Sequence, residues 1–293
     1  MNAQGTTHSF IAIDEGLGTL LRVDQNRPER DWTVPIGHPQ ARDMQLIGGG
    51  RILIGHDRGY TEFDVESGKK AKELSTLGGV TSVRRQADGT TLIAGVNVGG
   101  IPGVAVHTLD PKDTIIRTVH FQGDYVRLIR QDSAGNYLMC CNDRIREASP
   151  EGQYLRDYPV EGFLHAWKAV KLANGHLMVS AGYGSFMVEL AADGGTLRNF
   201  GAKDSVPQEV QPNFYAMFQV LPSGNLVVAN WQGHGPGHGG QGIQLLEFDP
   251  AGNIVWTWSQ ADRISSLQGI LVLDGLDLEL LHDERTGILR PSA

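Results

Sequence analysis

The chain has 293 residues, of which 40% are hydrophobic and 20% are charged, so it can bury a core and is not intrinsically disordered. Its net charge of −8 and the lack of a long basic run exclude nucleic acid and an anionic membrane surface as main partners, because both require a basic face. No apolar run approaches the roughly 18 residues of a membrane-spanning helix, and the 38 glycines favour a fold with many tight turns.

The N-terminal segment MNAQGTTHSFIAIDEG has no basic stretch followed by an apolar one, which is the pattern of a secretory signal. We therefore expect a cytoplasmic protein, and a periplasmic location stays open if a signal was removed. The only cysteines are the neighbours Cys140 and Cys141. Adjacent residues of a strand face opposite sides of a sheet, so we expect two free thiols and no disulfide between them.

Two sequence elements recur in order along the chain. The first is a turn rich in Asp and Gly that follows a short apolar strand, at Asp24, Asp64, Asp110, Ser149, Asp193 and Asp249. The second is a hairpin of two alternating apolar strands around a glycine turn, at 44–55, 83–95, 129–141, 170–180 and 219–230. The copies of the turn are spaced by about 40 to 57 residues, which is typical of β-propeller blades.

The two ends of the chain complete each other. The N-terminal stretch HSFIAIDEGLGTLLRVDQ has a second and a third strand but no first strand, and 264–274 is a first strand with no blade after it. We therefore predict an all-β fold, a six-bladed β-propeller of four-stranded antiparallel blades. Pairing of the C-terminal strand into the N-terminal blade closes this single domain of residues 1–293 and removes exposed sheet edges. Residues 276–293 are left as a tail or an extra strand.

The turn pattern D-x-x-G-K and the final DPAGNIVWTW resemble the quinoprotein-like, YVTN and arylsulfotransferase-like β-propeller superfamily. The run ANWQGHG followed by LLEFDPAGNIVWTW is similar to a group of uncharacterised bacterial propellers with an NWxGHG motif. The resemblance implies a WD40/YVTN-like propeller over nearly the whole chain. It implies no particular reaction, because these motifs specify the fold.

In a propeller, the start of each first strand and the end of each second strand lie on one face, around the mouth of the central channel. Residues at these positions of the chain are rich in His, Arg, aromatic residues and Asn. As ligand-binding residues we predict Arg42, Arg127, Trp167, Asn213, Tyr215, Asn230 and Trp231. As catalytic residues we predict His38, His165 and Tyr125.

Five of the ten histidines fall on this face: His38, His56, His165, His234 and His238. His234 and His238 lie in the long loop 233–242, and we predict that they bind a divalent metal ion, which would act as a Lewis acid. Their spacing is not a tight metal motif. The alternative of loop histidines hydrogen-bonded to the backbone therefore stays open.

Arginines recur at similar places in three blades, as Arg42, Arg84 and Arg127, where a guanidinium group can hold a carboxylate or phosphate. Arg127 and Tyr125 are two residues apart, so we expect both to point to the same side of a strand. Trp167 and Trp231 suit stacking on a sugar ring. The alternatives are ion pairs between blades for the arginines and packing between blades for the aromatic residues.

Together these residues predict a polar site for an anionic or carbohydrate-like small molecule. The chemistry would be a metal-assisted elimination, isomerisation or hydrolysis with a histidine as general base. Two other functions remain open, a non-catalytic protein-interaction propeller and a quinoprotein-type oxidoreductase. The sequence has no nucleophile signature such as G-x-S-x-G and no phosphate loop, so it does not identify a substrate.

Overall fold

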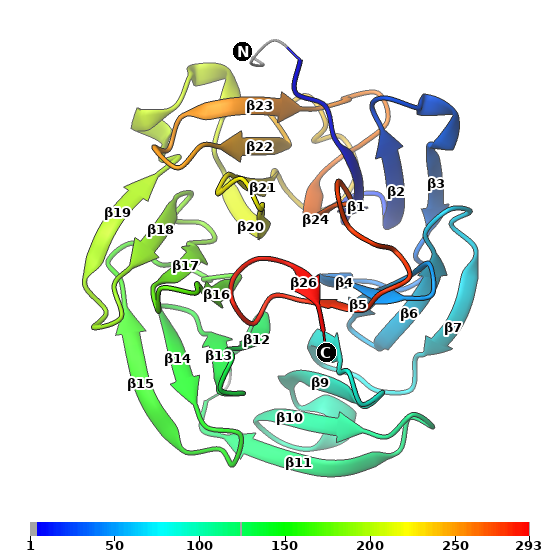
Figure 1. Ribbon diagram of the computed structural model, residues 1–293, viewed down its shortest axis with the longest axis vertical. Helices are drawn as coiled ribbons and strands as arrows, with labels where there is room; N and C mark the ends of the chain where they lie inside the picture. Colours follow the sequence, from blue (N-terminus) through cyan, green and yellow to red (C-terminus); the bar gives the residue numbers. More distant parts are fainter. Residues whose placement is uncertain (1–4, 124, 293) are drawn as a thin grey trace.

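Short apolar strands separated by glycine turns build six four-stranded antiparallel sheets in the computed structural model, which describes residues 5–123 and 125–292. Figure 1 shows the sheets as the blades of a propeller around a central axis. The predicted fold is confirmed. Within the described ranges the only helices are the short 3-10 turns η1 (Pro28–Arg30), η2 (Val98–Gly100), η3 (Lys203–Ser205) and η4 (Gln208–Val210), and none is long and apolar enough to span a membrane.

The strands run from the axis outward in each blade (Figure 1). The N-terminal blade has β24 (Leu267–Val272), β1 (Ser9–Asp14), β2 (Thr19–Asp24) and β3 (Trp32–Pro35). The next two have β4 (Asp43–Gly48), β5 (Arg51–His56), β6 (Gly59–Asp64) and β7 (Lys70–Leu74), then β8 (Val80–Arg85), β9 (Thr91–Val96), β10 (Val104–Leu109) and β11 (Ile115–Phe121). The fourth has β12 (Ile129–Gln131), β13 (Tyr137–Cys140), β14 (Arg144–Ala148) and β15 (Tyr154–Pro159). The last two have β16 (Ala169–Lys171), β17 (Leu177–Ser180), β18 (Met187–Leu190) and β19 (Thr196–Phe200), then β20 (Phe214–Val220), β21 (Leu226–Trp231), β22 (Leu245–Phe248) and β23 (Ile254–Trp258).

The ring is closed as predicted, by a strand from the C-terminal region. β24 pairs antiparallel with β1, with Phe10 opposite Val272 and Ile13 opposite Gly269. Apolar side chains from several blades then pack together across the axis, among them Met44, Leu128, Trp167, Met217 and Leu271, all buried. These side chains fill the middle of the molecule. A cavity at one end of the axis therefore does not continue through to the other end.

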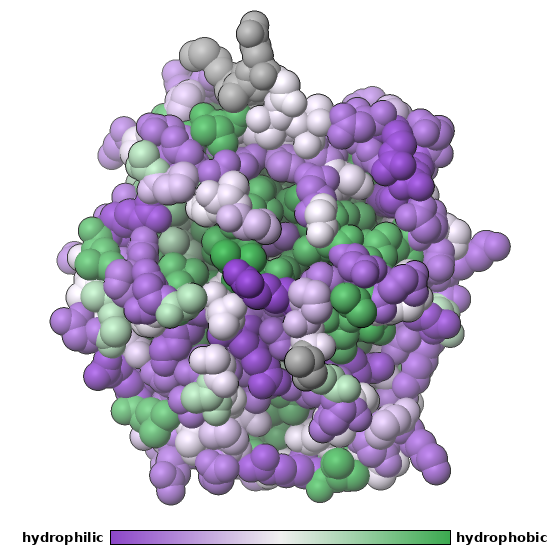
Figure 2. All heavy atoms as spheres, viewed as in Figure 1, coloured by the Kyte–Doolittle hydropathy of each residue, from purple (hydrophilic) through white to green (hydrophobic). Residues whose placement is uncertain are grey.

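The C-terminal tail, residues 274–292, covers the axis on the face that carries the turns between first and second strands (Figure 1). The backbone N–H groups of Gly49 and Gly50 donate to the carbonyls of Glu279 and Leu278, and Ile288 forms a bridge with Val220. The tail ends in a short hairpin of β25 (His282–Asp283) and β26 (Arg290–Pro291). Figure 2 shows this face, with hydrophilic and hydrophobic residues side by side where the tail crosses it.

A buried ionic cluster fixes the tail from within. The Glu284 carboxylate accepts from Arg130 Nε at 2.5 Å and from Lys168 Nζ at 2.6 Å, and Arg130 also pairs with Asp43 at 2.7 Å. All four residues are buried. Burial alone would raise the pKa of Glu284, but the charges of Lys168 and Arg130 outweigh it and lower the pKa to about 2. Tail and blades therefore form one unit.

Candidate functional site

A cavity of about 270 Å³ opens at the other end of the axis, and we call it the mouth cavity. It is lined by Glu15, Gln40, Arg42, Arg127, His165, Trp167, Tyr183, Phe214, Trp231, His234 and Gln268. These residues lie at or near the starts of first strands and the ends of second strands. Five blades contribute, and the β8–β11 blade contributes none of these residues.

Two arginines face the mouth cavity without an ion pair to a carboxylate of the described residues. Neither Arg42 nor Arg127 forms an ion pair within residues 5–123 and 125–292, and Arg42 donates to the side-chain oxygen of Gln40 at 2.7 Å. The Arg127 guanidinium lies 4.4 Å from the ring centroid of Tyr125. Burial and the charge of Arg127 lower the pKa of Arg42 to about 10, although the charges of Asp57 and Glu15 act in the opposite direction. Two partly buried like charges repel each other, and an anion between them would relieve that repulsion.

Buried polar atoms without a protein partner gather around the same cavity. In the described part of the chain they include Tyr125 Oη, Arg127 Nε, Trp167 Nε1 and Gln268 Oε1. A buried polar atom without a hydrogen bond costs about 1 to 3 kcal/mol, so such atoms are rare unless water or a ligand satisfies them. Three of the four atoms can donate, which suits an acceptor-rich ligand such as a carboxylate or phosphate.

His165 enters the cavity from a strained backbone conformation. Its φ is +58°, in the left-handed region, and its carbonyl packs against Gly182, where a Cβ atom would lie only 2.2 Å away. The ring lies 5.0 Å from that of Tyr125 and 5.6 Å from that of Tyr183. Burial and the charge of Arg127 lower the pKa of His165, so its imidazole is neutral near pH 7 and can accept a proton.

His234 and His238, the two predicted metal ligands, have their rings engaged by protein groups. His234 Nδ1 lies 2.8 Å from a Glu15 carboxylate oxygen, and His238 Nε2 lies 3.0 Å from the carbonyl of His234. His238 Nδ1 bonds the side chain of Gln241. Across residues 5–123 and 125–292 no three His, Cys, Asp or Glu side chains gather in a way that could hold a metal ion. The geometry therefore does not support the predicted metal site.

Of the three predicted catalytic residues, His165 lines the cavity, Tyr125 lies behind the lining, and His38 does not reach it. His38 stacks on His56 with ring centroids 4.1 Å apart and pairs with Glu73 at 2.8 Å, so its ring is directed to the outer part of its own blade. Tyr125 backs the cavity through its contacts with Arg127 and His165, and burial raises its pKa to about 12. Tyr125 and Arg127 both precede β12 and contact each other, so they do not lie on one side of a strand as we expected.

Three predicted ligand-binding residues lie behind the residues that line the cavity. Tyr215 is fully buried and its hydroxyl donates to the carbonyl of Gly201. Asn230 is also fully buried, and its amide bonds backbone carbonyls of neighbouring loops. Asn213 donates to the carbonyl of Trp231. These side chains position the cavity-lining residues and do not reach the cavity. The other four predicted ligand-binding residues, Arg42, Arg127, Trp167 and Trp231, do line it.

Sequence reasoning missed Glu15, Gln40 and Phe214 as lining residues. Glu15 follows β1, which is the second strand of the N-terminal blade because β24 supplies the first. Glu15 therefore lies at the end of a second strand, a position that marks the mouth in the other blades. Gln40 has a φ of +56°, and Phe214 packs edge-on against Trp231. Neither feature can be predicted from the residue types.

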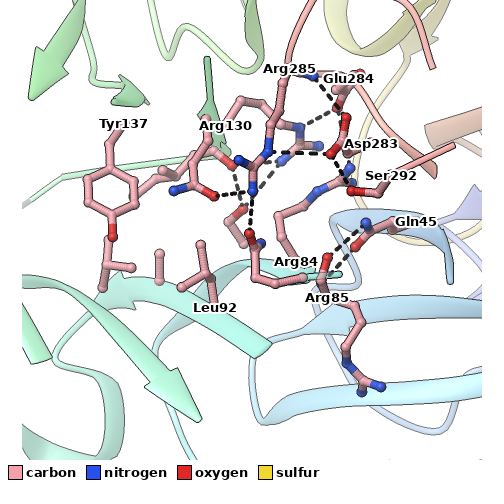
Figure 3. A pocket seen from close by; sticks show the side chains of 16 residues that line it. Gln45, Arg84, Arg85, Leu92, Arg130, Tyr137, Asp283, Glu284, Arg285 and Ser292 are labelled. Atoms are coloured by element: carbon pink, nitrogen blue, oxygen red, sulfur yellow. Dashed lines mark hydrogen bonds and ion pairs between the residues drawn. The ribbon is translucent and has the colours of Figure 1, made fainter. Parts of the chain in front are cut away.

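A second, much smaller cavity of about 30 Å³ lies between the tail and the β4, β8 and β12 blades (Figure 3). Arg84 lines it, donates to the carbonyl of Met44 and is buried beside Glu284. The sequence placed Arg84 at the mouth with Arg42 and Arg127, and that prediction was wrong, because its side chain belongs to the tail end of the axis. A volume of this size holds about one water molecule.

Comparison with known proteins supports the fold. No protein-family model and no curated protein matches the chain. A protein of unknown function from Bacteroides caccae is similar in structure, with a TM-score of 0.73, 22% identity, and 90% of this chain and 98% of that chain covered. A catalytically inactive variant of virginiamycin B lyase from Staphylococcus aureus, with quinupristin, gives a TM-score of 0.55 at 10% identity, covering 88% and 87%. A functionally unknown protein from Desulfotomaculum acetoxidans gives 0.54 at 13% identity, covering 91% and 99%. At these identities the likeness is one of fold, and the similar structures support the β-propeller part of the resemblance seen in the sequence.

Proposed function

We propose that the mouth cavity binds a small molecule carrying a carboxylate or phosphate group, and that the protein catalyses a proton-transfer reaction on it as a lyase, isomerase or hydrolase. The observation that carries this proposal is the pair Arg42 and Arg127, which face one cavity with no carboxylate partner in the described residues. Arginines that serve only packing or stability are normally paired with acidic groups.

The surroundings of the arginines fit such a ligand. Trp167, Tyr183 and Trp231 line the same cavity and offer ring surface to the non-ionic part of a sugar acid or another cyclic ligand. Gln40 and Gln268 add amide groups for hydroxyls. The cavity volume of about 270 Å³ suits a small molecule, and the packed axis and the tail close it from behind.

Proton transfer is the chemistry that the residues favour. The neutral His165 ring lies in the cavity next to Arg127, so it can remove a proton from a ligand whose anionic group the arginines hold. An anion bound by two cations makes a neighbouring carbon or hydroxyl more acidic. A lyase occurs on a similar fold, which supports the reaction class by analogy only.

The proposal is tested by melting the protein with a panel of anions, namely phosphate, sulfate, acetate and glucuronate. A ligand that binds only the folded state at about 100 times its Kd adds about 2.7 kcal/mol to stability and raises the Tm. We expect at least one anion to raise the Tm of the wild type. R42Q and R127Q should each weaken binding by about 10- to 100-fold, since each removes one charge-assisted hydrogen-bonding group.

The matched control is R58Q. Arg58 is an exposed arginine that follows β5 on the same face and does not line the cavity. It should leave the anion effect unchanged. If no anion raises the Tm, or if R58Q weakens binding as much as R42Q and R127Q do, the proposed site does not exist.

A non-catalytic interaction protein is the second candidate. Three neighbouring outer strands each expose an apolar side chain, Ile116 on β11, Leu155 on β15 and Leu197 on β19, with exposed fractions of 60%, 51% and 51%. Exposed apolar groups on the side of a propeller suit a protein partner. This candidate would be favoured by two results together. No anion would raise the Tm, and changing these three residues to Ser would abolish self-association or the capture of a partner protein.

A further inference from the structure

Glu15 and His234 form a hydrogen-bonded pair that lines the mouth cavity, and a third residue, Trp231, holds the Glu15 carboxylate in place. Both residues line the cavity, and the Glu15 carboxylate lies 2.8 Å from His234 Nδ1. The other Glu15 oxygen accepts from Trp231 Nε1 at 3.0 Å, and the Trp231 ring packs edge-on against the imidazole at 4.6 Å. Glu15 is nearly buried, with 12% of its side chain exposed, whereas 73% of the His234 side chain is exposed at the rim of the cavity.

The loop that carries His234 is held in one conformation although it is rich in glycine. The hydroxyl of Ser266 accepts from the backbone N–H groups of Gln232 and Gly233, and the hydroxyl of Ser265 donates to the carbonyl of Gly235. His238 Nε2 closes the loop on the carbonyl of His234 at 3.0 Å. A loop bonded at this many points presents the imidazole in a fixed place.

The three consecutive residues Asp14, Glu15 and Gly16 organise this arrangement. The buried Asp14 carboxylate accepts from the backbone N–H groups of Ser265 and Ser266, the two serines that hold the loop. Glu15 holds the imidazole itself. A Cβ atom on Gly16 would lie 2.5 Å from the carbonyl of Gly235, so only glycine allows the loop to approach this closely.

Because Glu15 accepts from Nδ1, the ring nitrogen that remains for a ligand is Nε2, which makes no hydrogen bond to another residue in the described ranges. The cavity thus contains two histidines in unlike surroundings. His165 lies near Arg127 and forms no ion pair with a carboxylate in the described residues, and His234 has Glu15 to balance a positive charge. Two histidines in such unlike surroundings suit the two roles of a proton-transfer reaction, general base and general acid.

We propose that the Glu15–His234 pair is the general acid of the mouth cavity, with His234 touching the substrate and Glu15 as its positioning residue. This inference rests on the proposed function and assigns a substrate class, an organic acid with a leaving oxygen on the carbon next to the one that loses a proton. His165 takes the proton from that carbon, and the electrons of the broken C–H bond form the new C=C bond. The leaving oxygen departs with the C–O bonding pair and receives the Nε2 proton of the His234 imidazolium. Exchange with water then removes the proton from His165 and returns one to His234.

The test is nitrogen-15 NMR of the histidine rings in the full chain. Without ligand, at a pH where the ring is neutral, His234 should carry its proton on Nδ1. E15A should lose this preference, and E15Q should keep it because the amide oxygen still accepts a hydrogen bond. The exposed His120, outside the cavity, is the internal reference. A proton on Nε2 in the wild type, or the same proton distribution in E15A, would overturn the pair.

Phosphate added to the same samples tests the position of His234 relative to a bound anion. The His234 ring signals should move with the same midpoint as the phosphate-induced rise in Tm, and R42Q should shift both midpoints together. A rise in Tm with unmoved His234 signals overturns the general acid and leaves the proposed function standing. No rise in Tm with any anion overturns the proposed function, and the general acid with it.

Discussion

The protonation of His165 depends on its burial and on its neighbour Arg127 in the mouth cavity. Burial and the Arg127 charge lower its pKa, so we predict that the ring titrates below its ordinary value of about 6.5. R127Q should move the midpoint upward, because it removes the repelling charge. R58Q should not move it. NMR titration of the His165 ring measures this directly, and an unchanged midpoint in R127Q would show that the two side chains do not interact.

For single residues, the sequence predicted four that line the mouth cavity, and their role in ligand binding stays a prediction. Arg42, Arg127, Trp167 and Trp231 were placed by strand ends alone, because the repeat fixes which backbone positions surround the mouth. Tyr215 and Asn230 sit at equivalent positions but turn into the wall, where they bond backbone carbonyls. Side-chain direction at a strand end depends on the neighbouring loop, and a pattern of residue types does not record it.

At the scale of elements, the connection before β16 depends on Gly182 in the loop after β17. Gly182 has a φ of +64°, and a Cβ atom there would lie 2.2 Å from the carbonyl of His165. We predict that G182A lowers stability by at least about 1 kcal/mol and displaces His165, because both backbone strain and a backbone clash arise. Chemical denaturation and the His165 ring signals measure the two effects.

G240A is the matched control for this variant. A Cβ atom on Gly240 would meet no atom within 4 Å, and its φ is not in the left-handed region. Equal stability losses in G182A and G240A would show that the Gly182 contact has no special role.

The strands and hairpins could be predicted from the sequence, because the alternation of apolar residues and the glycine turns define them. Close backbone approaches such as this one follow from the tertiary packing and were not predictable.

At the scale of the whole molecule, the tail joins the blades through Glu284. We predict that E284Q destabilises the protein at pH 7 by about 3 to 5 kcal/mol, because it leaves Arg130 and Lys168 buried without their shared carboxylate. The contribution of Glu284 is present above its ordinary pKa of about 4.5 and is lost as the pH falls toward its folded-state pKa of about 2. The stability difference between wild type and E284Q should therefore shrink between these two values. Urea unfolding at pH 7, 5 and 3 measures it.

E279Q is the control for the tail, since Glu279 is exposed and forms no ion pair in the described part of the chain. It should leave stability nearly unchanged at every pH. A stability difference between wild type and E284Q that stays constant across the pH range would show that the ionic cluster does not act as described.

The sequence located the tail but not its partners. Glu284, Arg130, Lys168 and Asp43 are far apart in the chain, and no local pattern connects them.

We propose above all that Arg42 and Arg127 form an anion site at the mouth of the propeller. The most direct measurement is the anomalous scattering of selenium in a crystal soaked in selenate, an analogue of sulfate. The claim predicts a strong anomalous peak in the mouth cavity, in contact with the guanidinium group of Arg42 or Arg127 and absent in the R42Q/R127Q double variant. Selenate peaks at exposed lysines and arginines elsewhere, with an empty mouth cavity at the same concentration, would contradict it.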